Sequence, residues 1–374
     1  MPVALIVTPK FLPFLGGMER ECALLAAELQ LRGFSPVIVT EQLGLDTPRR
    51  EESDGVRVHR VPSSPQRSLR VQLTVAARMA LLVLRYRGAG FAIVRTTTLP
   101  AVLVGLLKKL RLISFPTLVT AETGGEADDV VALAERPLFG LSRALVSAHD
   151  RLNGICQANV DHLREYGFPA EKITSIPNGI DTAAWGESTP PERVRRFLFL
   201  GRLDPEKGLF ELLEAFGRVR AGHPEATLTI AGEGPALDAL RERAGDGVSF
   251  AGRVPYERLG DVFDAHDCMV LPSYSEGMPL SVLEAAAHRR AMIITDVGDI
   301  RRMFGDRIRI IPPRDAGALA EAMEAAVADP SPRADYQEVI DRVGIAAVVD
   351  EMLARLGVAA VPGGAEARRY PGPR

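Results

Sequence analysis

The chain of 374 residues has few of the features that mark small secreted or membrane-bound proteins. Its three cysteines, Cys22, Cys156 and Cys268, are far apart in apolar contexts, which is typical of buried reduced thiols and argues against a disulfide framework. No apolar run approaches the roughly 18 residues of a membrane-spanning helix. The first residues reach Pro9 and Pro13 without a basic start or a small-residue cleavage site. These absences predict a cytoplasmic protein.

Histidine is scarce, and acidic residues are missing from one long stretch. The six histidines are scattered and no pair has metal-ligand spacing on one helix face, so no metal site is predicted. No Asp or Glu occurs between Gly55 and Ala121. The same stretch is rich in basic residues, namely Arg57, Arg60, Arg67, Arg70, Arg78, Arg85, Arg87, Arg95, Lys108, Lys109 and Arg111. This imbalance predicts an anionic partner for the first part of the chain.

The length and the order of apolar segments predict two domains. Short apolar runs such as VALIVT, PVIVT and FAIVRT alternate with longer helical patterns, and the alternation resumes with RFLFLG after a turn-rich segment at 176–192. This order is typical of βαβ units with a parallel sheet. We therefore expect an α/β fold with two Rossmann-like, doubly wound domains, at 1–185 and 186–335. A helical segment at 336–361, with packing back toward the first domain as one option, and a disordered tail at 362–374 complete the chain.

The segment SYSEGMPLSVLEAAAHRR at 273–290 is the first candidate site. Pro279 suits the first turn of a helix, where its missing N–H costs nothing. The N–H groups of Leu280 and Ser281 are then available to bind phosphate. Glu276 and Glu284 flank this helix start at the carboxyl end of a strand, where open α/β sheets bind ligands. The alternative is that the two glutamates are a capping acid and a solvated helix acid.

Two further loops carry candidate residues. In FLFLGRLDPEKGLFELLEAF at 197–216, Arg202 and Lys207 stand in one βα loop and can reach a diphosphate together, although such a basic loop is often plain surface. In FLPFLGGMERECALLAAEL at 11–29, Gly16 and Gly17 allow close approach of backbone to a ligand, and Glu19 opens a helix. This is not a dinucleotide fingerprint, because G-x-G-x-x-G is missing.

Taken together, these segments resemble the family 4 retaining glycosyltransferases of GT-B architecture, also called group 1 glycosyltransferases. The resemblance spans nearly the whole chain and rests on motifs in a fixed order: G-G-M-E at 16–19, S-I-P-N-G-I-D at 175–181, G-R-L-D-P-E-K-G at 201–208, A-G-E-G-P at 231–235, F-A-G-R-V at 250–254 and E-G-M-P-L-S-V-L-E at 276–284. It implies two domains facing each other across a cleft, the first on the acceptor side and the second binding the nucleotide sugar.

The resemblance also implies roles for individual residues. Catalytic roles fall to Glu276, Arg202 and Lys207, of which the two basic residues neutralise the donor diphosphate. The implied donor-binding residues are Gly16, Gly17, Arg253, Val254, Gly277, Met278, Pro279, Leu280, Ser281 and Glu284. Of these, Arg253 and Val254 would line the pocket for the nucleotide base, and Glu284 would bind the ribose hydroxyls. Such enzymes retain the anomeric configuration without a metal or other cofactor, by front-face attack in which the leaving phosphate helps to deprotonate the acceptor.

The sequence departs from the family pattern at two places. Many members have a histidine near the end of a first-domain strand, whereas this chain reads TAETGGE, so Glu122 and Glu126 are the acceptor-side candidates; the alternative is a solvated loop acid. His149 is more typical of a core histidine than of a substitute base. The helix after Glu284 ends in HRRAMIIT instead of the usual Gly and Pro, and we interpret Arg289 and Arg290 as a changed helix cap.

The implied activity is transfer of a hexose-type sugar from a nucleotide diphosphate sugar to a glycan or lipid-linked acceptor, in cell-envelope polysaccharide or glycolipid synthesis. A non-catalytic sugar-nucleotide-binding protein and a GT-B epimerase are the alternatives, and nucleic acid is not an expected partner. Helical spacing places Arg67, Arg70, Arg78 and Arg85 within roughly 80° of one another, with Leu69, Leu73, Leu81 and Leu84 on other faces. This stripe favours peripheral binding to the anionic inner face of a membrane; a solvated helix face is the alternative.

Overall fold

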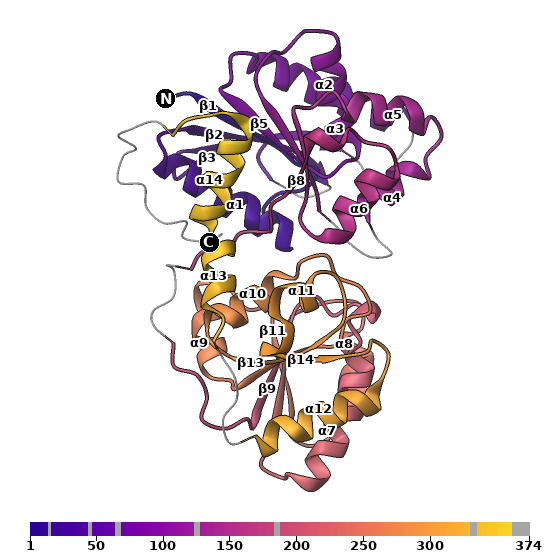
Figure 1. Cartoon of the computed structure of the whole chain (residues 1–374), viewed down its shortest axis with the longest axis vertical. Helices are drawn as coiled ribbons and strands as arrows, with labels where there is room; N and C mark the ends of the chain where they lie inside the picture. The colour runs from indigo at the N-terminus through magenta and orange to yellow at the C-terminus, as the bar shows by residue number, and fades with distance from the viewer. Residues whose placement is uncertain are drawn as a thin grey trace. The chain divides into compact units, whose positions relative to one another are not determined.

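The computed structural model describes residues 1–13, 16–43, 47–63, 69–122, 128–182, 188–329 and 335–360. The chain divides into two compact units, one formed by Met1–Gly179 with Ile345–Arg374 and the other by Ile180–Gly344 (Figure 1). The helical segment expected at 336–361 is therefore split. Helix α13 (Gln337–Val343) belongs to the second unit and α14 (Ile345–Leu356) to the first. The tail expected at 362–374 lies outside the described residues.

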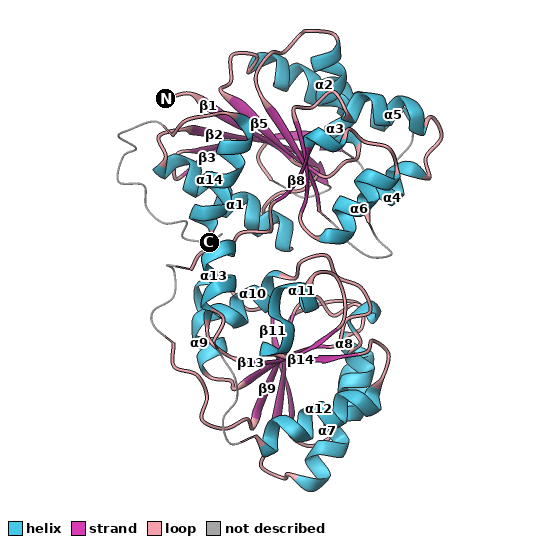
Figure 2. Ribbon diagram, in the orientation of Figure 1, coloured by secondary structure: helices cyan, strands magenta, loops and turns pink. Residues whose placement is uncertain are grey.

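The first unit is built on an eight-stranded sheet with the order β3-β4-β2-β1-β5-β6-β7-β8. The apolar runs that predicted strands are buried in it, and nearly all the pairings are parallel (Figure 2). The strands are β1 (Val3–Val7), β2 (Ser35–Leu43), β3 (Arg50–Ser53), β4 (Val56–Ser63), β5 (Phe91–Arg95), β6 (Thr117–Ala121), β7 (Arg151–Gly154) and β8 (Ile173–Ser175).

The β3–β4 hairpin is the antiparallel part of this sheet, and it was not predicted from the sequence. Its turn contains Asp54-Gly55, a dipeptide that favours tight hairpins. The alternation of VRVHRV in β4, with Val56 and Val58 buried and Arg57 half-buried, is the second signal that was available.

Helices cover both faces of the first sheet. Helices α2, α3 and α5 lie in the connections β4–β5, β5–β6 and β6–β7, which all run toward the β8 edge of the sheet. Because such crossovers are right-handed, these three helices lie on the same face. Helix α1 joins β1 to β2 in the opposite direction and packs with α14 on the other face. The helices are α1 (Gly17–Leu31), α2 (Leu69–Arg85), α3 (Leu99–Lys109), α4 (Asp129–Ala134), α5 (Phe139–Val146) and α6 (Gln157–Glu165), with a 3-10 turn η2 (Ala170–Lys172).

The second unit is built on a six-stranded sheet with the order β11-β10-β9-β12-β13-β14, and every pairing among its described strands is parallel. Its strands are β9 (Arg196–Leu200), β10 (Thr227–Ala231), β11 (Val248–Gly252), β12 (Cys268–Leu271), β13 (Ala291–Thr295) and β14 (Arg309–Ile311). Its helices are α7 (Leu209–Gly222), α8 (Leu237–Arg243), α9 (Leu259–Asp264), α10 (Leu280–Ala287), α11 (Ile300–Phe304), α12 (Ala316–Ala328) and α13, with 3-10 turns η3 (Pro205–Lys207), η4 (Tyr256–Arg258) and η5 (Gly305–Arg307). The prediction of two Rossmann-like parallel sheets is confirmed.

Helix α2 exposes both arginines and leucines. Arg70, Arg78 and Arg85 are exposed as predicted. Leu73 and Leu81, which were expected on other faces of the helix, are exposed as well. The buried side of the helix is formed by a second apolar stripe, Val75, Met79 and Val83. With leucines on the other faces, this stripe could not be told apart in the sequence. Arg67 lies outside the described residues.

The described part of the chain contains no helix that is both long enough and apolar enough to cross a membrane.

Candidate functional site

The loops that carry the candidate residues of the second unit share one edge of its sheet. All strands of this sheet are parallel, so the loops after β9, β12 and β13 emerge at the carboxyl edge. Gly208 fastens the first of these loops to the second: its φ is +65°, and a Cβ there would lie 2.1 Å from the carbonyl oxygen of Pro272. The Tyr274 N–H also donates to the Glu206 carbonyl at 2.9 Å. These two contacts hold the loop that carries Lys207 against the loop that carries Glu276.

Lys207 and Glu276 form an ion pair at this edge. The Lys207 ammonium donates to Glu276 Oε1 at 2.8 Å, and the two side chains are only 15% and 13% exposed. The structure therefore brings together a predicted cation and a predicted carboxylate that are 69 residues apart in sequence. An ammonium group has three N–H donors, so pairing with one carboxylate oxygen leaves two that can bind phosphate oxygens.

Helix α10 begins beside Glu276. We expected Pro279 within the first turn; it is the N-cap, one residue before the helix, with extended backbone. Its carbonyl accepts from the N–H of Val282, so the N–H groups of Leu280 and Ser281 precede the first paired donor, as predicted. Such a helix start carries a partial positive charge and suits an anion.

The loop after β13 supports the backbone at this helix start. A Cβ on Gly298 would lie 2.3 Å from the Gly277 carbonyl oxygen, so the two loops are in close contact. Met278, the next residue, is buried.

Glu284 is not a solvated helix acid, because it is 2% exposed within α10. Glu276 is not a capping acid either, since its carboxylate is paired with Lys207 and α10 has no side-chain cap. The alternative reading of this glutamate pair is therefore wrong. The proposed contact of Glu284 with a ribose stays a prediction.

Arg202, by contrast, does not contact the Lys207–Glu276 ion pair. Its guanidinium pairs with Asp204 at 2.8 Å and its side chain is 65% exposed. Arg253 is exposed and Val254 half-buried, both in the loop after the edge strand β11. These residues share the carboxyl edge with Lys207, but within the described residues no hydrogen bond or ion pair joins them to it.

The C-terminus of α10 has the changed cap that the sequence predicted. The N–H of Arg289 donates to the Ala286 carbonyl and that of Arg290 to the Ala285 carbonyl, which is the Schellman pattern. Arg289 occupies the left-handed position, with φ of +55°, where glycine is favoured. The Arg290 side chain is buried and donates to the carbonyl of His288.

In the first unit, Gly16 is the N-cap of α1 and Gly17 its first residue, so the helix begins two residues earlier than the expected Glu19. Glu19 is buried in the first turn, and its carboxylate lies against Gly16, where a Cβ would come within 2.4 Å of Oε2. The two glycines thus open a helix at the carboxyl end of β1, as the phosphate reading requires. Their contact with a donor stays a prediction.

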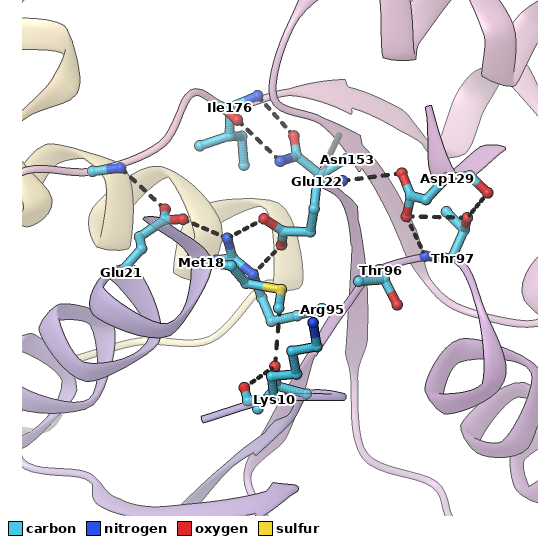
Figure 3. A network of polar contacts seen from close by, with 12 residues as sticks. Lys10, Met18, Glu21, Arg95, Thr96, Thr97, Glu122, Asp129, Asn153 and Ile176 are labelled. Atoms are coloured by element: carbon cyan, nitrogen blue, oxygen red, sulfur yellow. Dashed lines mark hydrogen bonds and ion pairs between the residues drawn. The ribbon is translucent and has the colours of Figure 1, made fainter. Parts of the chain in front are cut away.

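Glu122 belongs to a buried ionic cluster that was not predicted from the sequence. Arg95, at the end of β5, is fully buried and pairs with both Glu21 of α1 and Glu122 (Figure 3). Arg95 Nη2 donates to Glu122 Oε2 at 2.6 Å, and the other oxygen of Glu21 accepts from the N–H of Gly179 at 3.0 Å. Glu122 is therefore not a solvated loop acid. An arginine that ends an otherwise apolar strand, FAIVR, was the available signal.

The cluster continues to Asp129, the first residue of α4. Asp129 accepts from the N–H groups of Glu122 at 3.1 Å and of Thr97 at 2.6 Å (Figure 3). Burial raises the pKa of Glu122 to about 8, and Glu21 and Asp129 add to this effect while Arg95 opposes it. Burial likewise raises the pKa of Asp129 to about 6. Glu126, the other acceptor-side candidate, lies outside the described residues.

The remaining predictions concern residues with no chemical role. His149 is a core histidine, as expected: it is fully buried beside the Ala101 carbonyl at 2.9 Å, and burial lowers its pKa to about 4. Cys22, Cys156 and Cys268 are free and buried, which confirms the reduced-thiol reading. Burial raises the pKa of Cys22 to about 12.

Comparison with known protein families agrees with both halves of this description. The family described as "Glycosyl transferase 4-like domain" matches residues 16–179, and the family "Glycosyl transferases group 1" matches residues 194–329. The first match covers the glycine turn and the Arg95 cluster, and the second covers the Lys207–Glu276 edge.

Among curated proteins, the chain is 30% identical to the glycogen synthase of Mycobacterium tuberculosis over 242 residues, which is 62% of this chain and 58% of that protein. It is 39% identical to a putative teichuronic acid biosynthesis glycosyltransferase of Bacillus subtilis over 160 residues, 40% of each chain. It is 34% identical to a phosphatidyl-myo-inositol mannosyltransferase of Mycolicibacterium smegmatis over 177 residues, 43% of this chain and 44% of that protein. The chain thus spans about half the length of these relatives.

Solved structures resemble the chain over nearly its whole length. Sucrose-phosphate synthase from Thermosynechococcus elongatus has a TM-score of 0.77 at 22% identity, with 94% of this chain and 97% of that chain covered. HepE from Anabaena in complex with UDP-glucose has a TM-score of 0.72 at 15% identity, with 96% and 100% covered. At these identities the likeness concerns the fold.

Two parallel Rossmann-like sheets, with candidate residues at their carboxyl edges, define a protein of the GT-B class. The chain belongs to the group 1 glycosyltransferases, the family-4-like group that its motifs resembled.

Proposed function

We propose that this chain is a retaining glycosyltransferase that transfers a hexose-type sugar from a nucleotide diphosphate sugar to a glycan or lipid-linked acceptor in cell-envelope polysaccharide or glycolipid synthesis. The observation that carries the proposal is the Lys207–Glu276 pair, 2.8 Å apart, beside the start of α10. A cation, a carboxylate and free helix donors at one sheet edge match a ligand that has both phosphates and sugar hydroxyls.

In the proposed reaction, the bond between the sugar C1 and the donor phosphate oxygen breaks, and the phosphate keeps the electron pair. Lys207, Arg202 and the N–H groups of Leu280 and Ser281 stabilise the charge that develops on the phosphate. Glu276 accepts from sugar hydroxyls and fixes the ring. The acceptor hydroxyl attacks C1 from the face that the phosphate leaves, and its proton passes to the leaving phosphate.

The relatives support the substrate classes in the proposal. HepE binds UDP-glucose in its solved structure, which favours a nucleotide diphosphate sugar as donor. The teichuronic acid and phosphatidyl-myo-inositol enzymes, by their names, act on an envelope polymer and on a lipid. A peripheral location on the inner membrane face is part of the proposal, and the exposed Arg70, Arg78 and Arg85 support it.

The experiment that tests the proposal is incubation of the full chain with labelled UDP-, GDP- and ADP-sugars, first with water alone and then with candidate acceptors. Release of nucleoside diphosphate with a product of unchanged anomeric configuration is the expected result, and a chelator should leave the rate largely unchanged. An altered sugar on an intact donor would identify an epimerase, and donor binding without turnover would identify a silent binding protein; either outcome overturns the proposal.

A further inference from the structure

Exposed leucines gather on one part of the first unit. Nine large hydrophobic residues are exposed in the described part of the chain, and seven of them lie on or directly beside α2, α3 and α5: Leu73, Leu81, Leu106, Leu110, Leu112, Leu138 and Leu141. Leu81 and Leu138 are the most exposed of the seven, with 67% and 75% of their surface exposed. The other two are Met1 and Leu31, and the described residues of the second unit contribute none.

The three helices that carry these leucines are neighbours. Helix α2 packs on α3, and α3 packs on α5 (Figure 1). The contact with α5 is close, since a Cβ on Gly105 of α3 would lie 2.0 Å from the Leu145 carbonyl oxygen. Right-handed crossovers put all three on the same face of the sheet. We call these seven leucines, with the helices that present them, the leucine face.

The charges around the leucine face have a single sign. Its exposed basic residues are Arg70, Arg78, Arg85, Arg87, Lys109, Arg111 and Arg136, and none of them has an ion-pair partner among the described residues. No Asp or Glu occurs at 55–121 or at 136–149. The acids next to these two stretches are Asp54, Glu122, Glu135 and Asp150; Glu122 is buried beside Arg95, and Asp150 is paired with Lys108.

We infer that the leucine face docks on the surface of an anionic lipid bilayer, with its leucines entering the boundary between headgroups and acyl chains and its arginines contacting lipid phosphates. Exposed leucines beside unpaired arginines are the composition of an interfacial surface. This inference deepens the proposed function, on which it rests for its biological purpose, because it names the surface through which a lipid-linked acceptor is met.

A second copy of the chain fits this surface less well than lipid does. Two leucine faces brought together would oppose seven unpaired cations on each side with no carboxylate at 55–121 or 136–149 to compensate them. An anionic leaflet supplies the missing negative charge over a wide area, and it does so without a matched partner shape.

The test is co-sedimentation of the full chain with vesicles of phosphatidylcholine alone and of phosphatidylcholine with 30% phosphatidylglycerol. We expect binding to the anionic vesicles that weakens as salt is raised. The changes R70Q, R78Q and R85Q together should lower partitioning by about 100-fold, since one basic residue near an anionic leaflet is worth about fivefold. The pair L73S and L81S should lower it by about tenfold or more. The matched control is L31S, which removes an exposed leucine of α1 on the other face of the sheet.

Insertion is measured separately with a polarity-sensitive dye on a single introduced cysteine. The three native cysteines are buried, so L81C, L138C and the control L31C are labelled selectively. A blue shift with anionic vesicles at positions 81 and 138 but not at 31 is the expected result. Equal shifts at all three positions, or none, would overturn the inference.

Two further measurements keep this inference distinct from the proposed function. The variant K207A, changed in the donor site, should bind vesicles like the wild type, and L73S/L81S should keep normal donor hydrolysis in solution. If sedimentation equilibrium shows a wild-type dimer that L73S/L81S dissociates, while vesicle binding is unaffected, the leucine face is a self-association surface and the lipid assignment is wrong.

Discussion

Replacement of Lys207 by alanine is the sharpest test of the donor edge. At an effective dielectric constant of about 20, two unit charges separated by 2.8 Å attract by about 6 kcal/mol before desolvation is subtracted. Both side chains are mostly buried, and a hydrogen bond between charged groups retains about 1.5–3 kcal/mol after that subtraction. The alanine variant loses this coupling and also loses one preorganised cation at the leaving phosphate.

The second loss should dominate the kinetics. Removal of one such donor costs about 100- to 1,000-fold in turnover, or about 2.7–4 kcal/mol of transition-state stabilisation. The fold should persist, because Lys207 lies in a short 3-10 turn and not in the sheet. The assay is kcat and KM for donor hydrolysis and transfer, beside thermal melting and a donor-binding titration. Arg202→Ala serves as the comparison, since its exposed guanidinium belongs to the same loop but not to the pair.

A double-mutant cycle with Glu276→Gln tests the pair itself. In Lys207→Ala the Glu276 carboxylate is left unpaired and repels the donor phosphates, so neutralising it should restore part of the loss. The kcat of the double variant is therefore expected to lie within about tenfold of the kcat of Lys207→Ala. This is far above the kcat that results if the two single losses are multiplied. Strict additivity, or a Lys207→Ala enzyme with kcat within about threefold of wild type, would refute the reasoning.

Three further predictions follow from other contacts. Arg95→Met should destabilise the first unit by about 3–5 kcal/mol, because it leaves the buried carboxyl groups of Glu21 and Glu122 without their shared cation. Differential scanning calorimetry should show the loss as a lowered transition temperature, and partial restoration by adding Glu122→Gln is the control. Glu122 has its pKa raised to about 8, so its contribution is complete below its usual pKa near 4.5 and is lost as pH rises through 8. The free energy of unfolding from urea titrations should therefore fall between about pH 5 and pH 8 in the wild type, by up to about 1.4 kcal/mol per pH unit, and it should fall less in Glu122→Gln; parallel profiles would contradict this. Arg289→Gly should raise the stability of the second unit by about 0.5–1 kcal/mol, because it relieves a left-handed arginine, while Arg289→Ala, which keeps the Cβ, should not.

The sequence by itself determined the fold class and the family, because both depend on local patterns. Alternating apolar runs predict strands and helices in order, and the parallel βαβ arrangement follows from that order. The loops that carry Gly16, Lys207 and Glu276 were found for the same reason, since each directly follows a strand and precedes a helix. The carboxyl edge that they share is a consequence of parallel topology, not of any one residue.

Contacts between distant segments were decided only by the tertiary structure. Nothing local pairs Lys207 with Glu276, or surrounds Arg95 with Glu21 and Glu122, because these pairs form only when strands that are far apart in sequence become neighbours in a sheet. Burial is likewise a tertiary property. The sequence left open whether Glu122 is a solvated loop acid, and it did not say which leucines of α2 are exposed. Glu122 is enclosed and Leu73 is exposed because of what packs around each of them.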